Sequence, residues 1–261
     1  MTMRSFVTCF LLCLGLTGLG YLSLVAAQPQ ALFAEANRAY ANRAYEEALA
    51  LYDSVAAQGQ VSAELYYNLG NTHYQLGHLA EALLHYERAL RLNPGHQDAA
   101  FNRRLVAQKV VDNIEPQPEF VLTRWARELM DGRTATQWGT MAMALLWGVV
   151  IAVAVLLFVP RPRVRRAAFV IGILLGLLSV SGLGLGLLRH QRVESEQYGL
   201  IMTPNAYVKN APGGDTDLLL LHEGVKVRLL DQVDDWTRVE LEGANLGKVV
   251  GFVRSEQIGV I

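Results

Sequence analysis

Cysteine is almost absent from this chain of 261 residues. Only two are present, Cys9 and Cys13, and both lie in an apolar segment near the amino terminus that we expect to be removed. The mature chain would then contain no thiol, disulfide or thiolate metal ligand. The chain also has no large excess of charge: its net charge is −1, and neither residues 28–137 nor residues 189–261 are basic. We therefore expect no nucleic-acid partner.

Residue sets that carry catalysis are also missing. The six histidines do not pair at a metal-ligand spacing with supporting carboxylates; they are His73, His78, His85, His96, His190 and His222. The glycines at Gly182, Gly184 and Gly186 lie in an uncharged stretch, where small residues let two helices approach closely. No Ser/His/Asp set, exposed carboxylate pair or phosphate loop stands out. The sequence predicts that the protein is not an enzyme and uses no cofactor or metal.

Charge is absent from two long apolar stretches, residues 138–159 and 167–188, of 22 residues each. As helices they would be about 33 Å long, enough to cross the hydrocarbon core of a bilayer. The connecting residues 160–166 contain four arginines, and the positive-inside rule places such a turn in the cytoplasm. The sequence therefore predicts a two-helix transmembrane hairpin, with the rest of the chain on the far side of the membrane.

The amino-terminal segment agrees with this orientation. Arg4 is followed by an apolar run that ends in Val25, Ala26 and Ala27, as in a secretory signal cleaved after Ala27. We assign residues 1–27 to a signal peptide, with an uncleaved anchor as the alternative because the apolar run is long. The predicted location is the inner (cytoplasmic) membrane, with both globular domains in the periplasm.

A fixed sequence period runs through the first polar part of the chain. It relates Ala48 to Ala82 and several further pairs: Asn37 and Asn71, Tyr40 and Tyr74, Tyr52 and Tyr86. A period of about 34 residues, with small and aromatic residues at fixed positions, is typical of tetratricopeptide repeats. In such repeats Gly70 and Ala82 would lie where two helices cross, and Gly77 would turn the chain. We assign residues 28–112 to two repeats and a capping helix, and residues 113–137 to a linker.

The inner face of such an array commonly holds another protein. We expect it to present six residues: Asn37, Tyr40, Tyr67, Asn71, Tyr74 and Phe101. Amides could bond the backbone of an extended peptide, and aromatic rings could pack on its side chains. The alternative is that the tyrosines only fill the layers between helices.

Residues 195–261 show a period of about two. Val225, Val227 and Leu229 alternate with basic residues, and Gly, Asp and Asn turns follow, which predicts a small all-β barrel. The run 206–212, residues 220–224 and the pair 235–236 resemble bacterial SH3-like domains. Gly251 and Phe252 stand where that family usually has Gly-Trp. Tyr207, Trp236 and Phe252 are the candidate binding aromatics, with packing as the alternative role for Trp236.

The order of these parts resembles the BatE family of the Bacteroides aerotolerance operon. The resemblance rests on the repeat motifs at 65–71 and 86–94, the arginine turn, and the SH3-like residues 211–212 and 221–224. It implies neighbouring membrane proteins with von Willebrand factor A domains, whose adhesion sites bind protein ligands. It also implies a MoxR-type ATPase on the cytoplasmic side.

The combined prediction is a multi-domain chain: an all-α tetratricopeptide solenoid, a transmembrane hairpin and an all-β SH3-like barrel. Its expected function is that of a non-enzymatic inner-membrane scaffold, which binds partner envelope proteins through its two periplasmic domains. The alternative is a cell-wall protein that binds or senses peptidoglycan through the SH3-like domain.

Overall fold

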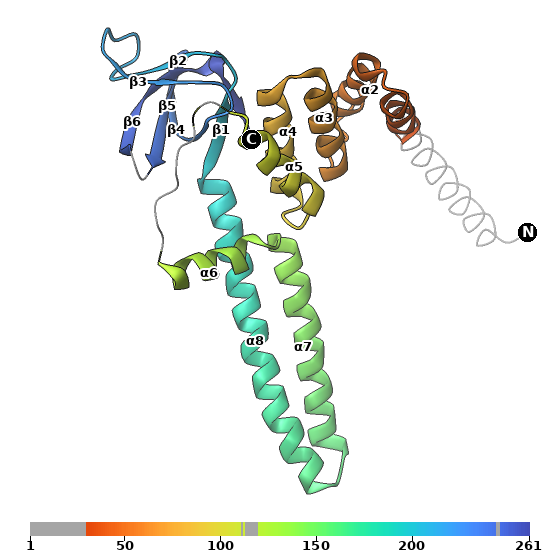
Figure 1. The fold of residues 1–261 in the computed structure, drawn as a ribbon. Coiled ribbons are helices and arrows are strands. Elements are labelled where there is room, and N and C mark those ends of the chain that lie inside the picture. The colour runs from red at the N-terminus through yellow and green to blue at the C-terminus, as the bar shows by residue number, and fades with distance from the viewer. Residues whose placement is uncertain (1–29, 111, 113–119, 244–245) are drawn as a thin grey trace, which may run out of the picture.

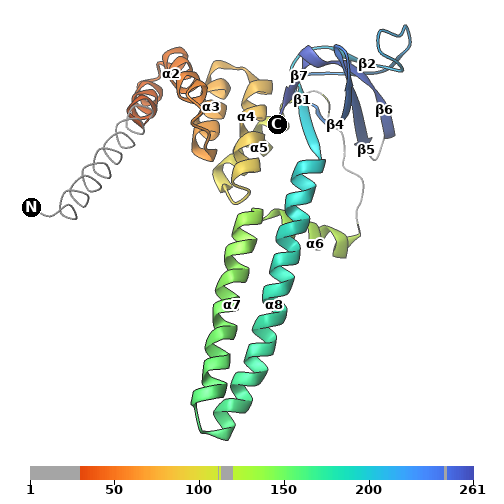
Figure 2. The same ribbon diagram turned by 180° about the vertical axis from the view of Figure 1, so that it is seen from behind.

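The structure, a computed structural model, describes residues 30–110, 112, 120–243 and 246–261. Paired helices, a long helical hairpin and an antiparallel sheet follow one another along the chain (Figure 1). The connection between the two hairpin helices lies at the free end of the hairpin. The paired helices and the sheet lie side by side at the opposite end (Figures 1 and 2). The expected helical repeat region and two long apolar helices are present, and the carboxyl-terminal part, expected to be all-β, is an antiparallel sheet. The expected signal peptide lies outside the described residues.

The paired helices occupy the first polar part of the chain. After a helix at 30–41 come α2 (Tyr45–Ala57), α3 (Ala63–Leu76), α4 (Leu79–Leu92) and α5 (Gln97–Ala107). Helices α3 and α4 cross at Gly70, where an added Cβ would lie 2.6 Å from the Tyr86 ring and 3.2 Å from the Ala82 carbonyl oxygen. Only glycine therefore permits this helix separation.

The residues expected to form a linker, 113–137, include a helix. Helix α6 spans Val121–Asp131, and the first long apolar helix, α7, follows at Ala135–Phe158. The α7 helix begins earlier than the expected span at 138 because Thr134 caps it. The hydroxyl of Thr134 accepts from the Gln137 backbone N–H (3.2 Å), and the Gln137 side chain accepts from the Thr134 backbone N–H (2.9 Å).

The second apolar helix also extends beyond the expected span at 167–188. Helix α8 runs from Pro162 to Ser195, so it includes most of the expected turn at 160–166. A helix accepts proline in its first turn and tolerates arginine well, so the end of an apolar run need not end the helix.

Helices α7 and α8 form the hairpin through small residues. Gly172, Gly182 and Gly186 approach α7 so closely that an added Cβ would lie 3.2–3.5 Å from Ala152, Ala142 and Trp138 respectively. The Ser179 hydroxyl donates across the interface to the Ala142 carbonyl oxygen (2.8 Å). Only 11% and 17% of the most apolar stretches of α7 and α8 are buried. Both helices are long and apolar enough to cross a membrane, and their outer faces are uncovered.

The carboxyl-terminal part is a seven-stranded antiparallel sheet in the order β3-β2-β6-β5-β4-β1-β7. Its strands are β1 (Gln197–Ile201), β2 (Ala206–Lys209), β3 (Asp217–Leu221), β4 (Lys226–Val233), β5 (Trp236–Gly243), β6 (Gly247–Arg254) and β7 (Ile258–Val260). A 3-10 turn, η1 (Ser255–Gln257), precedes the last strand. Alternate residues face the core, which includes Val208, Val227, Val239, Leu241 and Val253.

The sheet packs against the repeat helices through apolar side chains. Leu200 of β1 is fully buried in the same cluster as Leu83 and Leu84 of α4. At Gly259 of β7, an added Cβ would lie 2.8 Å from Leu84. The outer side of α4 is thus covered by β1 and β7, and Ala99 and Val106 of α5 belong to the same buried cluster as Leu200 (Figure 1).

Polar contacts connect the same two parts. Glu87 on α4, 11% exposed, pairs with Lys226 on β4 (2.9 Å) and with Arg103 on α5 (3.0 Å). Burial alone would raise the pKa of Glu87, but the two cations lower it below its usual value. Arg88 donates two hydrogen bonds to the Val260 carbonyl oxygen (2.6 and 3.0 Å). Asp112 accepts from the His222 backbone N–H at 2.7 Å.

Candidate site on the inner face of the repeat helices

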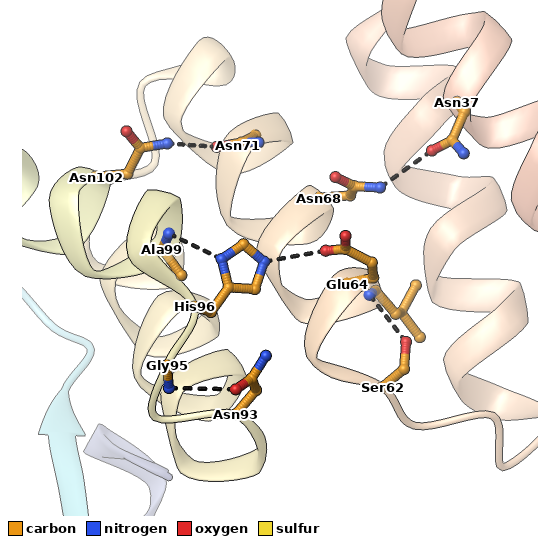
Figure 3. Close-up of polar contacts among 11 residues, drawn as sticks. Asn37, Ser62, Glu64, Asn68, Asn71, Asn93, Gly95, His96, Ala99 and Asn102 are labelled. Atoms are coloured by element: carbon orange, nitrogen blue, oxygen red, sulfur yellow. Dashed lines mark hydrogen bonds and ion pairs between the residues drawn. The ribbon is translucent and has the colours of Figure 1, made fainter. Parts of the chain in front are cut away.

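Two asparagines hold successive helix pairs together with the same set of contacts. Asn37 accepts hydrogen bonds from the Tyr52 hydroxyl (2.6 Å) and the Asn68 amide (3.1 Å). The repeat-related Asn71 accepts from the corresponding hydroxyl and amide of the next repeat, which belong to Tyr86 (2.8 Å) and Asn102 (2.9 Å). Figure 3 shows the two amide contacts beside each other. The sequence period thus reflects a repeated hydrogen-bond pattern that sets the spacing of the helices.

A pocket of about 270 Å³ lies on the inner face. It is lined by residues from the 30–41 helix, α3, α4 and α5: Tyr40, Tyr67, Asn71, Tyr74, Gln75, Tyr86, Asn102, Leu105 and Val106. Phenol and amide groups dominate this lining, and no charged side chain is included. Lys109 lies next to the pocket and donates to the Tyr74 hydroxyl (2.8 Å) from above the tyrosine ring.

Two phenols of the pocket, those of Tyr40 and Tyr86, remain neutral at physiological pH. Burial raises the pKa of Tyr86 far above its usual range and also raises the pKa of Tyr40. A neutral phenol both donates and accepts hydrogen bonds, as do the amide side chains. The pocket can therefore bond peptide groups or uncharged polar side chains while the tyrosine rings contact apolar surface.

Four of the six residues expected on the inner face line this pocket: Tyr40, Tyr67, Asn71 and Tyr74. Asn37 and Phe101 do not; Phe101 lies on α5 and is 60% exposed. From the sequence we expect the asparagines to bond a peptide backbone, but the side-chain carbonyl oxygens of Asn37 and Asn71 already accept hydrogen bonds from neighbouring helices. In Asn71 the amide group is the part that could donate to a ligand.

Sequence reasoning missed five lining residues: Gln75, Tyr86, Asn102, Leu105 and Val106. The repeat period contained a signal for three of them, since Tyr86 stands one repeat length after Tyr52. Leu105 stands one repeat length after Asn71, and Asn102 stands one repeat length after Asn68. The irregular sequence of the capping helix hid this phase, because Arg103 and Arg104 interrupt its apolar pattern.

Histidines cluster on the same repeat without forming a metal site. The rings of His73 and His85 stack at 5.1 Å, and the Nδ1 atoms of His73 and His78 are 3.4 Å apart. His96 caps α5 by accepting from the Ala99 backbone N–H (3.3 Å), and its other nitrogen contacts Glu64 at 3.0 Å (Figure 3). Within the described part of the chain, no group of three or more His, Cys, Asp or Glu side chains could hold a metal ion.

The three aromatic residues expected on the carboxyl-terminal domain share one face of the sheet. Phe252 lies opposite Lys209 and Arg238 on the neighbouring strands, and Trp236 lies opposite Arg254. Directly opposed residues point to the same side, and Tyr207 is two positions from Lys209 on β2. This is the outward face, on which Tyr207 is 49% exposed. The Arg254 guanidinium lies 5.6 Å from the Trp236 ring centre.

Comparison with known proteins identifies the helical repeat. The tetratricopeptide repeat family matches residues 63–96, which cover α3, α4 and the turn up to His96, the cap of α5. No curated protein matches the chain. The chain therefore contains a tetratricopeptide repeat, a unit that typically mediates binding between proteins.

Proposed function

We propose that this protein is a non-enzymatic, membrane-anchored scaffold that binds an extended segment of a partner protein in the pocket of its repeat helices. One observation carries the proposal: the inner face has an uncharged pocket of about 270 Å³ whose tyrosines and amides come from successive helix pairs. Peptide recognition needs such hydrogen-bonding groups beside apolar surface.

The structure around the pocket supports this role. The sheet domain packs against α4, while the pocket opens on the inner side of the array. The hydrogen bonds of Asn37 and Asn71 fix the helix spacing before any ligand binds. A preformed pocket loses little conformational entropy when it binds a peptide.

The proposed location is the inner membrane, with both globular domains in the periplasm. Two observations support it: α7 and α8 leave their apolar faces uncovered, and four arginines lie at the hairpin end far from both domains (Figure 1). Under the positive-inside rule that end is cytoplasmic.

The proposed partners are membrane proteins with von Willebrand factor A domains, in a Bat-type aerotolerance complex. A MoxR-type ATPase on the cytoplasmic side completes the proposed set. This part of the proposal rests on the sequence resemblance to the BatE family, whereas the pocket gives only the chemistry of the bound segment.

Affinity purification from gently solubilised native membranes tests the proposal. Wild type is compared with Gln75→Ala/Leu105→Ala, since both side chains line the pocket and both are exposed. We expect wild type to retain membrane proteins with von Willebrand factor A domains, and the double variant to lose most of them.

Leu92→Ala is the matched control, because Leu92 is 43% exposed at the end of α4 and does not line the pocket. It should retain partners as wild type does. Equal retention by all three proteins would place the binding surface elsewhere. Loss by both variants would indicate a general defect rather than a pocket.

Labelling of single cysteines tests the topology. In a background with Cys9→Ser and Cys13→Ser, Ser195→Cys should react with an impermeant maleimide on intact spheroplasts. Val164→Cys should react only after the membrane is permeabilised. The reverse pattern would overturn the proposed orientation.

A second candidate function is peptidoglycan binding by the sheet domain. The outward face that carries Tyr207, Trp236 and Phe252 favours it, because aromatic rings stack on sugars and stem peptides. The detergent-solubilised protein should then co-sediment with purified peptidoglycan, and Tyr207→Ala should weaken the association. Absence of the wild type from the pellet would remove this candidate.

A further inference from the structure

Helix α6 has a strongly amphipathic sequence and an uncovered apolar face. Val121, Trp125 and Leu129 are spaced four residues apart, so they lie along one side of the helix, with Leu122 beside them. The exposed fraction is 79% for Val121, 63% for Leu122, 60% for Trp125 and 38% for Leu129. Phe120, just before the helix, is 72% exposed. A soluble surface helix would turn such a face toward a core.

The charged residues of α6 lie along a separate side of the helix. Arg124 and Glu128 pair along the helix at 2.9 Å, and Arg127 and Asp131 lie on the same side. These two basic and two acidic residues balance one another. Binding to a surface would therefore be driven by the apolar face and would need no anionic charge.

Contacts fix α6 at one end of the hairpin. Asp131 pairs with Arg189 (3.0 Å) and is 3.8 Å from Arg192, and both arginines follow the uncharged part of α8. The Trp138 indole donates to the Met130 carbonyl oxygen (3.4 Å), and Trp138 begins the uncharged part of α7. The end of α6 is thus held at the level where both apolar helices become polar.

The direction of α6 matches this position. Figures 1 and 2 show α6 crossing α8 at a steep angle, near the hairpin end that adjoins the globular domains. If α7 and α8 cross a bilayer, α6 lies along its surface. Asp131, on the charged side, points to the part of α8 that lies beyond the apolar stretch.

We propose that α6 is an interfacial helix, whose apolar face, with Leu122, Trp125 and Leu129, is buried at the boundary between lipid headgroups and acyl chains. The uncovered surface of α6 is then continuous with the lipid-facing surface of the hairpin. Trp125 is suited to this depth, because tryptophan is enriched at membrane interfaces. The inference rests on the proposed membrane anchoring and adds a third lipid contact that limits tilting of the globular domains.

Spin-label accessibility in the full chain tests the inference. Single cysteines replace Leu122, Trp125 or Arg127 in the Cys9→Ser/Cys13→Ser background, and the protein is reconstituted in phosphatidylcholine vesicles. Collision rates with oxygen, which is concentrated in lipid, are compared with those of a water-soluble nickel chelate. We expect an oxygen-to-nickel ratio several-fold higher at 122 and 125 than at 127.

Two reference positions separate the possible failures. Val150→Cys reports the outer face of α7, and Glu46→Cys reports an exposed position on α2. A lipid-like ratio at 150 with water-like ratios at 122 and 125 would overturn the α6 inference alone. A water-like ratio at 150 would overturn the membrane anchoring as well. Low collision rates with both reagents at 122 and 125 would mean that protein, not lipid, covers the face, which also contradicts the inference.

Discussion

Arg43 and Gly77 occupy the same phase of successive repeats, and both have a left-handed backbone conformation. The φ angles are +63° at Arg43 and +83° at Gly77. Each residue turns the chain between the two helices of its pair. Glycine adopts this conformation without the steric cost that a Cβ imposes. The first repeat therefore keeps the turn geometry of the second, although its turn residue is less suited to this conformation.

Arg43→Gly should stabilise the helical part. The left-handed conformation costs an arginine about 1–2 kcal/mol, and the added flexibility of glycine in the unfolded chain offsets part of that gain. We expect the free energy of unfolding to rise by about 0.5–1 kcal/mol, measured by urea denaturation followed by circular dichroism. Gly77→Ala is the converse control and should destabilise by about 1 kcal/mol. A loss of stability in Arg43→Gly would contradict this explanation.

His85 should make the repeat sensitive to acid. Burial, followed by the neighbouring His73 and Arg88, lowers the pKa of His85 to about 3 from 6.5. As the pH falls, the His85 side chain is protonated at a higher pH in the unfolded chain than in the folded one. The stability that neutral His85 contributes is therefore complete above pH 6.5 and is lost as the pH falls toward 3. Between pH 7 and pH 5 this group alone should reduce the free energy of unfolding by at most about 2 kcal/mol.

His85→Phe isolates that effect because phenylalanine keeps a ring beside His73 and does not titrate. The difference in stability between pH 7 and pH 5 should be smaller in the variant than in wild type. Urea denaturation at the two pH values gives both differences. Equal differences would assign the acid sensitivity to other groups, such as Glu87, whose pKa is also lowered in the folded protein.

At the scale of elements, the hairpin depends on which side of α8 each glycine occupies. At Gly186 an added Cβ would lie 3.2 Å from the Trp138 side chain and 3.4 Å from the Ala135 carbonyl oxygen, whereas at Gly184 nothing lies within 4 Å. The two glycines are equally small and only two residues apart. Only Gly186 faces α7, so close helix approach requires glycine there and not at Gly184.

Gly186→Leu should therefore separate α7 from α8, while Gly184→Leu serves as the matched control. Overpacking of a close interface costs about 1–3 kcal/mol, which should lower the thermal unfolding midpoint of the detergent-solubilised protein. Gly184→Leu should leave that midpoint near the wild-type value. Equal effects of the two substitutions would show that the hairpin does not depend on this contact.

At the scale of the whole molecule, an ionic contact with a largely buried carboxylate joins the repeat helices to the sheet. Glu87 bridges Arg103 of its own domain and Lys226 of the sheet. A buried carboxylate that loses one cationic partner retains its desolvation cost. The interface therefore couples the stability of two domains that lie far apart in the sequence.

A double-mutant cycle on Glu87→Gln and Lys226→Met measures this coupling in the full chain. We expect a coupling energy of about 1–3 kcal/mol in the free energy of unfolding, since the two residues touch across the interface. The exposed pair Asp231 and Arg238, 3.9 Å apart within the sheet, should give at most about 1 kcal/mol in the same measurement. Coupling no larger than that of the exposed pair would mean that the docking does not rely on Glu87.

The sequence by itself determined the parts whose signal is local. The repeat period, the two uncharged stretches and the alternating strands indicate helix pairs, two long apolar helices and a sheet. Each pattern repeats within a few residues or one repeat length. Four of the pocket residues followed from the same periodicity. Helix α6 escaped the prediction because Pro116 and Pro118 favoured a linker, although its residues have the spacing of an amphipathic helix.

Only the tertiary structure decided how the parts meet. The contacts of Glu87 with Lys226 and of Asp112 with His222 join residues more than a hundred positions apart, and no periodicity records such a pair. Asp131 and Arg189, which place α6 at the end of the hairpin, are 58 positions apart and likewise belong to no sequence period. Docking depends on the complementary shape and charge of two finished surfaces, which exist only after each element has folded. For that physical reason the sequence indicated a binding face, while the tertiary structure selected the residues that line it.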